Sequence, residues 1–404
     1  MAADKNKLHI VCFALITALC LIGDSMLYVV LPIHFQEAGL SSLWEVGVIL
    51  AVNRIVRLPL NPLVARLYGR VSERTGILAA IAIGVLTTAS YGFMPGFAFW
   101  IAARCLWGVA WTLLRIGSLF CILRLSSPGN RGHYTGVYNG VYRLGSLVGM
   151  LFGGILADFA GVSFTALLFS LISAVSLIPA LLFIPKGKSG SEQAAVSGFG
   201  ADFKVVFSDP DVCRLLLAGG AIALVVQGVL ASTLSRLIAV HTYGGIELAG
   251  LFVGAASLGG FFQALRWSWE PWLAPLTGRL SDKKYGRLRM LFWVLCAAAV
   301  FLVLLAAPLP LALWFCVLPG MQVLATALTT LSDAALADAA AFSGKRNLLV
   351  FYAFIVDAGA AFGPLAAYAF IEFSGVDAAY VFAAALFCVL SLSLRPQAAR
   401  GTVR

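Results

Sequence analysis

Charged side chains inside long apolar segments are the residues of this sequence best suited to chemistry. The acids are Asp24, Glu270, Asp333 and Asp357, and the bases are Arg54, Arg57, Arg104, Arg115, Arg143, Arg236 and Arg266. Inside a bilayer each such charge costs about 2.5–3.5 kcal/mol, so each is a candidate for binding a proton, a charged solute or an opposite charge. We expect Arg236 and Asp333, near the ends of their segments, to reach the membrane interface instead.

The composition indicates that these segments cross a membrane. The chain has 404 residues, of which 61% are apolar and 11% charged, and its mean hydropathy is +0.95. Soluble proteins average roughly 45–50% apolar and about 25% charged residues. This difference excludes an ordinary soluble enzyme, a disordered chain and a secreted disulfide scaffold. Because a spanning helix needs roughly 20 residues, the length fits about twelve spans.

The apolar runs predict the helices that position these charges. Six runs precede a polar stretch and six follow it, which predicts an all-α integral membrane protein with twelve transmembrane helices in two halves. The predicted domains are residues 1–185, a linker at 186–211, and residues 212–404. The runs lie near 9–33, 43–65, 76–94, 98–123, 136–157, 163–184, 213–240, 247–276, 289–309, 312–336, 347–372 and 377–395.

The distribution of Lys and Arg predicts the orientation. They are absent from the loops after odd-numbered segments and collect in the other loops and both tails, as Arg70, Lys284 and Arg400 illustrate. Such residues mark cytoplasmic loops. We therefore expect a protein of the inner membrane with both termini cytoplasmic, and we attribute the net charge of +10 to these loops rather than to nucleic-acid binding.

An internal repeat relates the two halves. The loop at 65–74 resembles the loop at 278–287, at an offset of 213 positions. The glycine pair Gly145 and Gly149 recurs as Gly359 and Gly363, at an offset of 214. Two such halves, related by an axis along the membrane normal, are one known plan of transporters.

These loops resemble the cytoplasmic-loop signature of the major facilitator superfamily, G-x-L-A-D-R-x-G-R-R. The first loop departs from it at Ala65, Gly69, Ser72 and Glu73, and the second has one extra residue before its second glycine. Arg104 and Gly108 match the fourth-helix pattern R-x-x-x-G. The resemblance covers essentially the whole chain and implies the family's twelve-helix fold. The matching loop residues are Leu67, Arg70, Arg74, Gly278, Leu280, Asp282, Gly286 and Arg287.

A glycine pattern in the fifth segment resembles the family's antiporter signature, G-x8-G-x3-G-P-x2-G-G. Met150 stands where the signature has proline. The resemblance implies an exporter driven by protons or ions, most like the drug/proton antiporters. A packing role is the alternative, because glycines four residues apart let membrane helices approach closely. The matching residues are Gly136, Gly145, Gly149, Gly153 and Gly154.

In the family fold, helix two packs on helix eleven and helix five on helix eight. The resemblance therefore pairs Arg57 with Asp357 and Arg143 with Glu270. The repeat adds that each base corresponds to an acid in the other half: Arg57 plus 213 positions is Glu270, and Arg143 plus 214 is Asp357. We expect two salt bridges between the halves that close the cytoplasmic side. A role in folding alone is the alternative.

Helices one and four line the central cavity in the family, which brings Asp24 and Arg104 within reach of each other. A substrate or proton that disturbs this pair would drive proton exchange, as in drug/proton exchangers. A purely structural ion pair is the alternative. Weaker candidates for the substrate cavity are Trp111, Arg115, Gln227, Gln322 and Thr326, although Thr side chains in membrane helices often bond backbone carbonyls.

The sequence thus predicts proton-coupled export of a small organic or amphipathic compound by a monomer that needs no cofactor. Uptake by symport is an alternative, since the buried bases would suit an anionic solute. A sensor built on a transporter scaffold is another. We expect no enzyme activity and no metal site, because the histidines are scattered and no catalytic set is evident.

Overall fold

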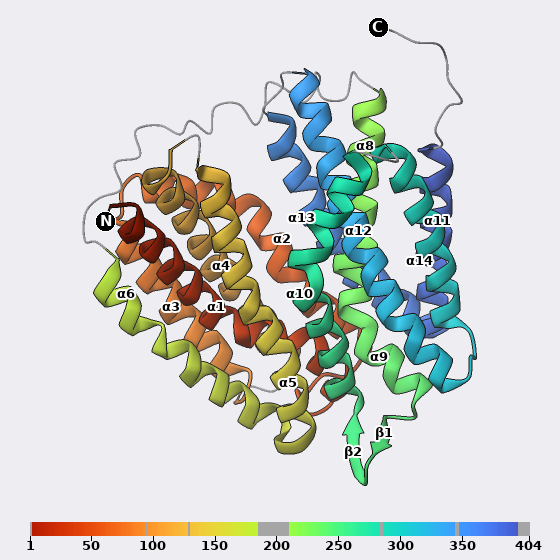
Figure 1. Cartoon of the computed structure of the whole chain (residues 1–404). Coiled ribbons are helices and arrows are strands. Elements are labelled where there is room, and N and C mark those ends of the chain that lie inside the picture. Colours follow the sequence, from red (N-terminus) through yellow and green to blue (C-terminus); the bar gives the residue numbers. More distant parts are fainter. Residues whose placement is uncertain are drawn as a thin grey trace, which may run out of the picture. The chain divides into compact units, whose positions relative to one another are not determined.

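The computed structural model describes residues 2–93, 96–127, 130–184, 210–282, 286–343 and 347–394. Within them almost every element is a helix, and one short β-hairpin is present (Figure 1). Of the predicted linker, only Pro210 and Asp211 lie among the described residues, where they begin a helix.

The helices belong to two compact units, each described here by itself. The first contains the described residues up to 184 together with 232–267, and the second contains 210–231 and the described residues from 268 onward. The division into halves at 1–185 and 212–404 stays a prediction from the repeat.

The first unit is built around a long helix packed against its neighbours. α1 (Ala2–His34) packs along α5 (Arg131–Val175), while α4 (Phe97–Leu125) contacts both α2 (Leu43–Tyr68) and α3 (Glu73–Ser90). A short helix, α6 (Leu177–Phe183), also packs on α1 and α3. The unit further includes most of α9 (Ala231–His241), the hairpin strands β1 (Gly245–Leu248) and β2 (Leu251–Gly254), and the beginning of α10 (Ala255–Leu280).

A single glycine divides α5 into two helices. Gly161 has φ 81° and ψ 166°, a conformation that residues with a Cβ avoid. The chain turns back at this point (Figure 1), so the 45 residues of α5 correspond to the two separate segments expected at 136–157 and 163–184.

Local signals explain where α2 and α3 begin. Ser42 caps α2 by accepting a hydrogen bond from the Glu45 amide, and Glu45 in turn accepts one from the Ser41 amide. Ser72 caps α3 through the Thr75 amide at 3.1 Å. These bonds satisfy amides that have no partner inside the helix.

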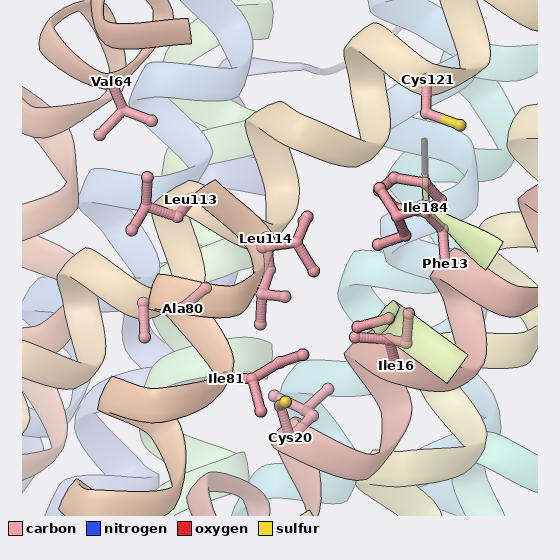
Figure 2. Close-up of a cluster of buried hydrophobic side chains, with 14 of the residues drawn as sticks. Phe13, Ile16, Cys20, Val64, Ala80, Ile81, Leu113, Leu114, Cys121 and Ile184 are labelled. Atoms are coloured by element: carbon pink, nitrogen blue, oxygen red, sulfur yellow. The ribbon is translucent and has the colours of Figure 1, made fainter. Parts of the chain in front are cut away.

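Apolar side chains from five helices, α1, α2, α3, α4 and α6, fill the interior of the first unit. Phe13 and Ile16 on α1 meet Ile81 on α3 and Leu114 on α4, all of them buried (Figure 2). Lipid is as apolar as these side chains, so close packing and not the hydrophobic effect supplies the stabilisation. This cluster holds α1 and α4, the helices that carry Asp24 and Arg104, in a fixed register.

The second unit repeats the same kind of packing. α13 (Asn347–Ser374) packs on α8 (Pro210–Ala223) and on the π-helical turn η1 (Leu224–Leu230) that follows it. α11 (Arg287–Ala306) contacts both α12 (Leu311–Ser343) and α14 (Val376–Ser393).

The helix lengths confirm a helical membrane protein. Among the described residues, 9 helical stretches are long and apolar enough to cross a membrane. One of them, His133–Phe183, has 51 residues and turns back at Gly161, and α3 and α10 are further membrane-length helices outside that set. The helices agree with the expected twelve spans.

The start of the eighth segment differs from the prediction. The apolar run from 247 begins as an antiparallel hairpin, in which Gly245 pairs with Gly254, and the helix starts only at Ala255. Positive φ angles at Tyr243, Ala249 and Gly250 turn the chain here and prevent helix formation.

The repeat reappears in the helix boundaries. α3 and α11 begin at Glu73 and Arg287, and α4 and α12 begin at Phe97 and Leu311, each pair 214 positions apart. α2 and α10 each have 26 residues and each contain two prolines, Pro59 and Pro62 in one and Pro271 and Pro275 in the other.

Candidate functional site

Asp24 on α1 and Arg104 on α4 form a buried ion pair. Nη1 of Arg104 donates to Oδ1 of Asp24. The Arg104 side chain is fully buried, and that of Asp24 is 11% exposed. The structure thus brings together the two residues that the resemblance implied, and their role in proton coupling stays a prediction.

Helix α2 supplies the other polar contacts of this pair. Nδ2 of Asn53 lies 3.4 Å from Oδ1 of Asp24, and Nε of Arg104 donates to the Ile49 carbonyl at 3.1 Å. The close approach requires Gly108 on α4, where a Cβ would collide with the Asn53 carbonyl oxygen. The R-x-x-x-G pattern therefore has a local reason: its glycine lets α2 bring Asn53 to the carboxylate.

Two tyrosines extend the polar cluster. Tyr91, which stacks on Trp100 with ring centroids 4.8 Å apart, interacts with the Arg104 guanidinium. Tyr28, one turn after Asp24 on α1, accepts a hydrogen bond from Nε of Arg54 at 3.2 Å. The sequence did not single out Tyr28, Asn53 and Tyr91, because uncharged polar residues are common in membrane helices and their contacts depend on helix rotation.

The cluster combines a carboxylate with a permanent cation and is almost closed to water. A buried carboxylate beside a guanidinium is stable while the pair is intact, and removal of one partner leaves an expensive buried charge. A cation or a proton that bound at Asp24 would therefore compete with Arg104. Such competition is the physical requirement for exchanging one ligand against another.

The glycine pattern of α5 holds it against α1, the helix that carries Asp24. A Cβ at Gly145 or Gly149 would collide with the carbonyl oxygens of Ala18 or Ile22, and one at Gly153 would collide with Met26. Gly154 lies in the same way against Ala256 on α10, whereas a Cβ at Gly136 would meet no atom of the described residues within 4 Å. Four of the five pattern residues therefore have a packing role, and their link to antiport stays a prediction.

The second unit uses its glycines in the same way. Gly359 and Gly363 on α13 lie against the carbonyl oxygens of Gly220 and Leu224, and Gly363 also touches Gly228. The contact coincides with the π-helical turn η1, which carries Gln227. Turns of this kind inside helices are frequent at functional sites.

The four residues of the expected salt bridges between the halves divide between the two units. Arg57 and Arg143 belong to the first unit, where their guanidinium carbons lie 5.8 Å and 5.3 Å from the ring centroids of Trp111 and Trp267. Asp357 and Glu270 belong to the second unit. Both salt bridges therefore stay predictions.

The two loop signatures are built differently. In the second, Asp282 accepts from Arg287, which also donates to the Ala334 carbonyl at 2.7 Å and pairs with Asp338 at 3.0 Å. Gly286 caps α11 with φ 78°, which explains this glycine of the signature. A Cβ at Gly278 would meet no atom of the described residues within 4 Å.

In the first loop, Ser72 caps α3 with an ordinary φ of −68°, and Glu73 pairs with Arg124 at 2.8 Å. Leu67 and Arg70 are exposed, and Arg74 is half-buried.

The weaker candidates for a substrate cavity differ in burial and in hydrogen bonding. Gln322 is 1% exposed, and neither its amide nitrogen nor its amide oxygen has a hydrogen-bond partner among the described residues. The Thr326 hydroxyl donates to the Gln322 carbonyl, as expected for a threonine satisfied within its own helix. Gln227 is half-buried and Arg115 is exposed. Trp111 lies under the Arg57 guanidinium, and its buried indole nitrogen also lacks a hydrogen-bond partner among the described residues. Gln322, with two such atoms, is the stronger candidate for binding a ligand.

Comparison with known proteins assigns a family. A sequence model described as Major Facilitator Superfamily matches residues 13–269. Similar curated proteins include the chromaffin granule amine transporter of Rattus norvegicus, 25% identical over 186 residues, and the vesicular acetylcholine transporter of Mus musculus, 30% identical over 151 residues. These matches cover 46% and 37% of this chain but only 34% and 28% of those proteins. The chain thus spans about a third of the length of the curated relatives it matches.

Solved structures share the fold. The nucleoside transporter NupG superposes with a TM-score of 0.75 at 14% identity, over 96% of this chain and 98% of that one. A transporter of the POT family, solved with a thioalcohol conjugated peptide, gives 0.76 at 12% identity over 98% of each chain. Identities this low establish the fold alone.

Proposed function

The chain belongs to the Major Facilitator Superfamily, and we propose that it exports a small organic compound in exchange for protons by alternating access. Membership of the family makes it a multi-pass membrane transporter. The outward direction, the coupling to protons and the class of solute are the parts that we propose, together with an inner-membrane location and cytoplasmic termini.

The buried pair of Asp24 and Arg104 is the observation that carries the proposal. The Asp24 carboxylate binds the guanidinium and an amide of Asn53, and its side chain keeps 11% exposure. In an alternating-access cycle this is the carboxylate that takes up a proton or an organic cation and releases its partner when it becomes neutral. In exchange, the two ligands occupy this group in turn.

An organic amine is the first class of solute to test. A carboxylate in a cluster that includes the Tyr28 and Tyr91 rings suits a cationic nitrogen. Two of the curated relatives are named as an amine transporter and an acetylcholine transporter, which points to the same class. Against an anionic solute, the guanidinium groups of the buried Arg57 and Arg266 and of the half-buried Arg143 each lie over an indole ring.

Purified protein in liposomes with an imposed pH gradient tests the proposal. A panel of cationic, neutral and anionic compounds is screened for compound-induced proton flux. Asp24→Asn is compared with Asp211→Asn, which removes a carboxylate that is 86% exposed at the start of α8. We expect proton flux opposite to an amine in the wild type and in Asp211→Asn, and none in Asp24→Asn.

The other outcomes each decide between the remaining interpretations. Proton flux in the same direction as the compound would establish symport. Exchange that persists in Asp24→Asn would remove Asp24 from the coupling. A protein that binds compounds from the panel yet moves none of them would favour a sensor.

A further inference from the structure

The end of α1 opposite its N-terminus carries a histidine between two carboxylates. Nδ1 of His34 lies 2.9 Å from Oε1 of Glu37, and Nε2 lies 2.9 Å from Oδ1 of Asp158 on α5. A neutral imidazole has one N–H, so it can donate to only one of these oxygens. Both contacts can be hydrogen bonds at the same time only when the three side chains hold one proton more than a neutral imidazole with two carboxylates.

Asp158 passes this contact on to α10. Its second oxygen, Oδ2, accepts hydrogen bonds from the backbone amide of Ser257 at 2.8 Å and from the Ser257 hydroxyl at 2.6 Å. Ser257 lies in the first turn of α10, where amides lack partners within the helix and favour a negative charge. Gly254 packs directly against the same carboxylate, and a Cβ there would collide with it. Asp158 therefore connects α1, α5 and the start of α10.

The contact between α5 and α10 continues beyond Asp158 without intervening side chains. Gly154 lies against the Ala256 carbonyl, and Gly260 lies against the Met150 carbonyl. The close contact runs from Met150 and Gly260 past Gly154 and Ala256, and it ends at Asp158 and Ser257. The group of His34, Glu37 and Asp158 lies at that end and is the polar latch of the contact.

The latch can exchange protons with water. The Glu37 side chain is 53% exposed, while those of His34 and Asp158 are 15% and 11% exposed. Glu37 also lines a pocket of about 140 Å³ together with Tyr91 and Phe93. The charged groups that act on the imidazole are Glu37, from the turn after α1, and Asp158, from α5, while α10 contributes the neutral Ser257. The latch lies ten residues beyond Asp24 on α1, roughly 15 Å along the helix, and is a separate site.

We propose that His34, Glu37 and Asp158 form a second proton-binding site, which holds α5 and α10 together when it is occupied. Loss of the proton leaves one of the two carboxylates without its donor and frees α10 to separate. On the predicted topology the latch faces away from the cytoplasm, so an acidic exterior closes this side after solute release. That use in transport rests on the proposed function, whereas the proton-dependent contact does not.

Hydrogen exchange of the first turn of α10 tests the site in the purified full chain without substrate. The Ser257 amide donates to Asp158, so peptides covering residues 252–262 report the contact directly. After correction for the intrinsic pH dependence of exchange, we expect these amides to exchange about tenfold faster at about pH 8.5 than at about pH 5.5, across the range in which histidine titrates. Peptides from α14 serve as the reference for overall folding.

A permanently charged variant and an uncharged variant of His34 identify the group that binds the proton. His34→Arg carries a permanent cation and should protect the amides at both pH values, whereas His34→Gln should protect them at neither. His241→Gln, which changes another histidine of the first unit, should behave as the wild type. A pH response that is absent from the wild type, or that persists in His34→Gln or in His34→Arg, would overturn the proposal.

The measurement is independent of transport. If the protein moves no solute but shows this pH response, the proposed function is contradicted and the proton site is supported. If the protein exchanges protons for solute but shows no pH response in these amides, the proposed function is supported and the proton site is contradicted.

Discussion

Glu73 and Arg124 form an ion pair whose charges are reversed at the equivalent positions of the second repeat. The Glu73 carboxylate, at the first residue of α3, lies 2.8 Å from the guanidinium in the last turn of α4. The residues 214 positions later are Arg287, the first of α11, and Asp338 on α12, which pair at 3.0 Å. Equivalent helices are therefore joined in both repeats, α3 to α4 and α11 to α12, with the acid and the base exchanged.

We predict that this ion pair tolerates exchange. The double variant Glu73→Arg with Arg124→Glu should unfold at a temperature close to that of the wild type, because the second repeat already uses this polarity. Arg124→Gln alone leaves Glu73, which is 1% exposed, buried without its cation and should cost about 3 kcal/mol. Glu73→Gln leaves the 37% exposed Arg124 in reach of water and should cost about 1 kcal/mol or less. Thermal unfolding in detergent measures these differences, and a double variant as unstable as Arg124→Gln would contradict the prediction.

The glycine pattern of α5 offers a matched pair of substitutions. Gly149→Ala places a methyl group against the Ile22 carbonyl, whereas Gly136→Ala meets no atom within 4 Å. We expect Gly149→Ala to destabilise the protein by about 1–3 kcal/mol through overpacking, and Gly136→Ala to have little effect. Thermal unfolding compares the two, and equal stabilities would show that α1 and α5 are not held this closely.

Arg104 should be sensitive to the shape of its side chain as well as to its charge. Its guanidinium donates to both Asp24 and the Ile49 carbonyl, and a lysine ammonium cannot reproduce that planar arrangement. We expect Arg104→Lys to fold but to exchange protons for solute at least about tenfold more slowly, the rate factor for about 1.4 kcal/mol. Liposome flux and thermal unfolding separate the two effects. Unchanged flux would mean that charge alone suffices at this position.

The predicted salt bridge between Arg57 and Asp357 calls for a charge exchange. Neutralising either residue should reduce transport, and the double variant Arg57→Asp with Asp357→Arg should restore part of it. Arg57→Lys isolates the stacking on Trp111, because it keeps the charge but loses the planar group that lies over the indole. If the exchanged variant is as inactive as the single ones, these residues do not form a pair.

The sequence predicted the helices and the repeat better than it predicted the contacts. Long apolar runs predict the number of spans, because backbone groups in lipid must form their hydrogen bonds within a helix. The hairpin at 245–254 was missed, since an apolar run alone does not distinguish a helix from two short strands. Asp158 was also missed, because it lies at the end of its run and its partner His34 is 124 positions away. Which ring lies under Arg57 depends on helix rotation, which the spacing of residues leaves open.

Gln322 provides a test that separates stability from function. Its amide is buried, and neither of its polar atoms has a hydrogen-bond partner among the described residues, which costs about 1–3 kcal/mol in a protein interior. Gln322→Leu keeps much of the side-chain volume and removes the unsatisfied groups, so it should raise the unfolding temperature. If the amide binds solute, the same variant should transport at least about tenfold more slowly, because one hydrogen bond to solute is lost. Thr326→Val, whose hydroxyl is satisfied by its own helix, is the control and should leave transport unchanged. A more stable Gln322→Leu protein with full transport would show that this amide does not touch the solute.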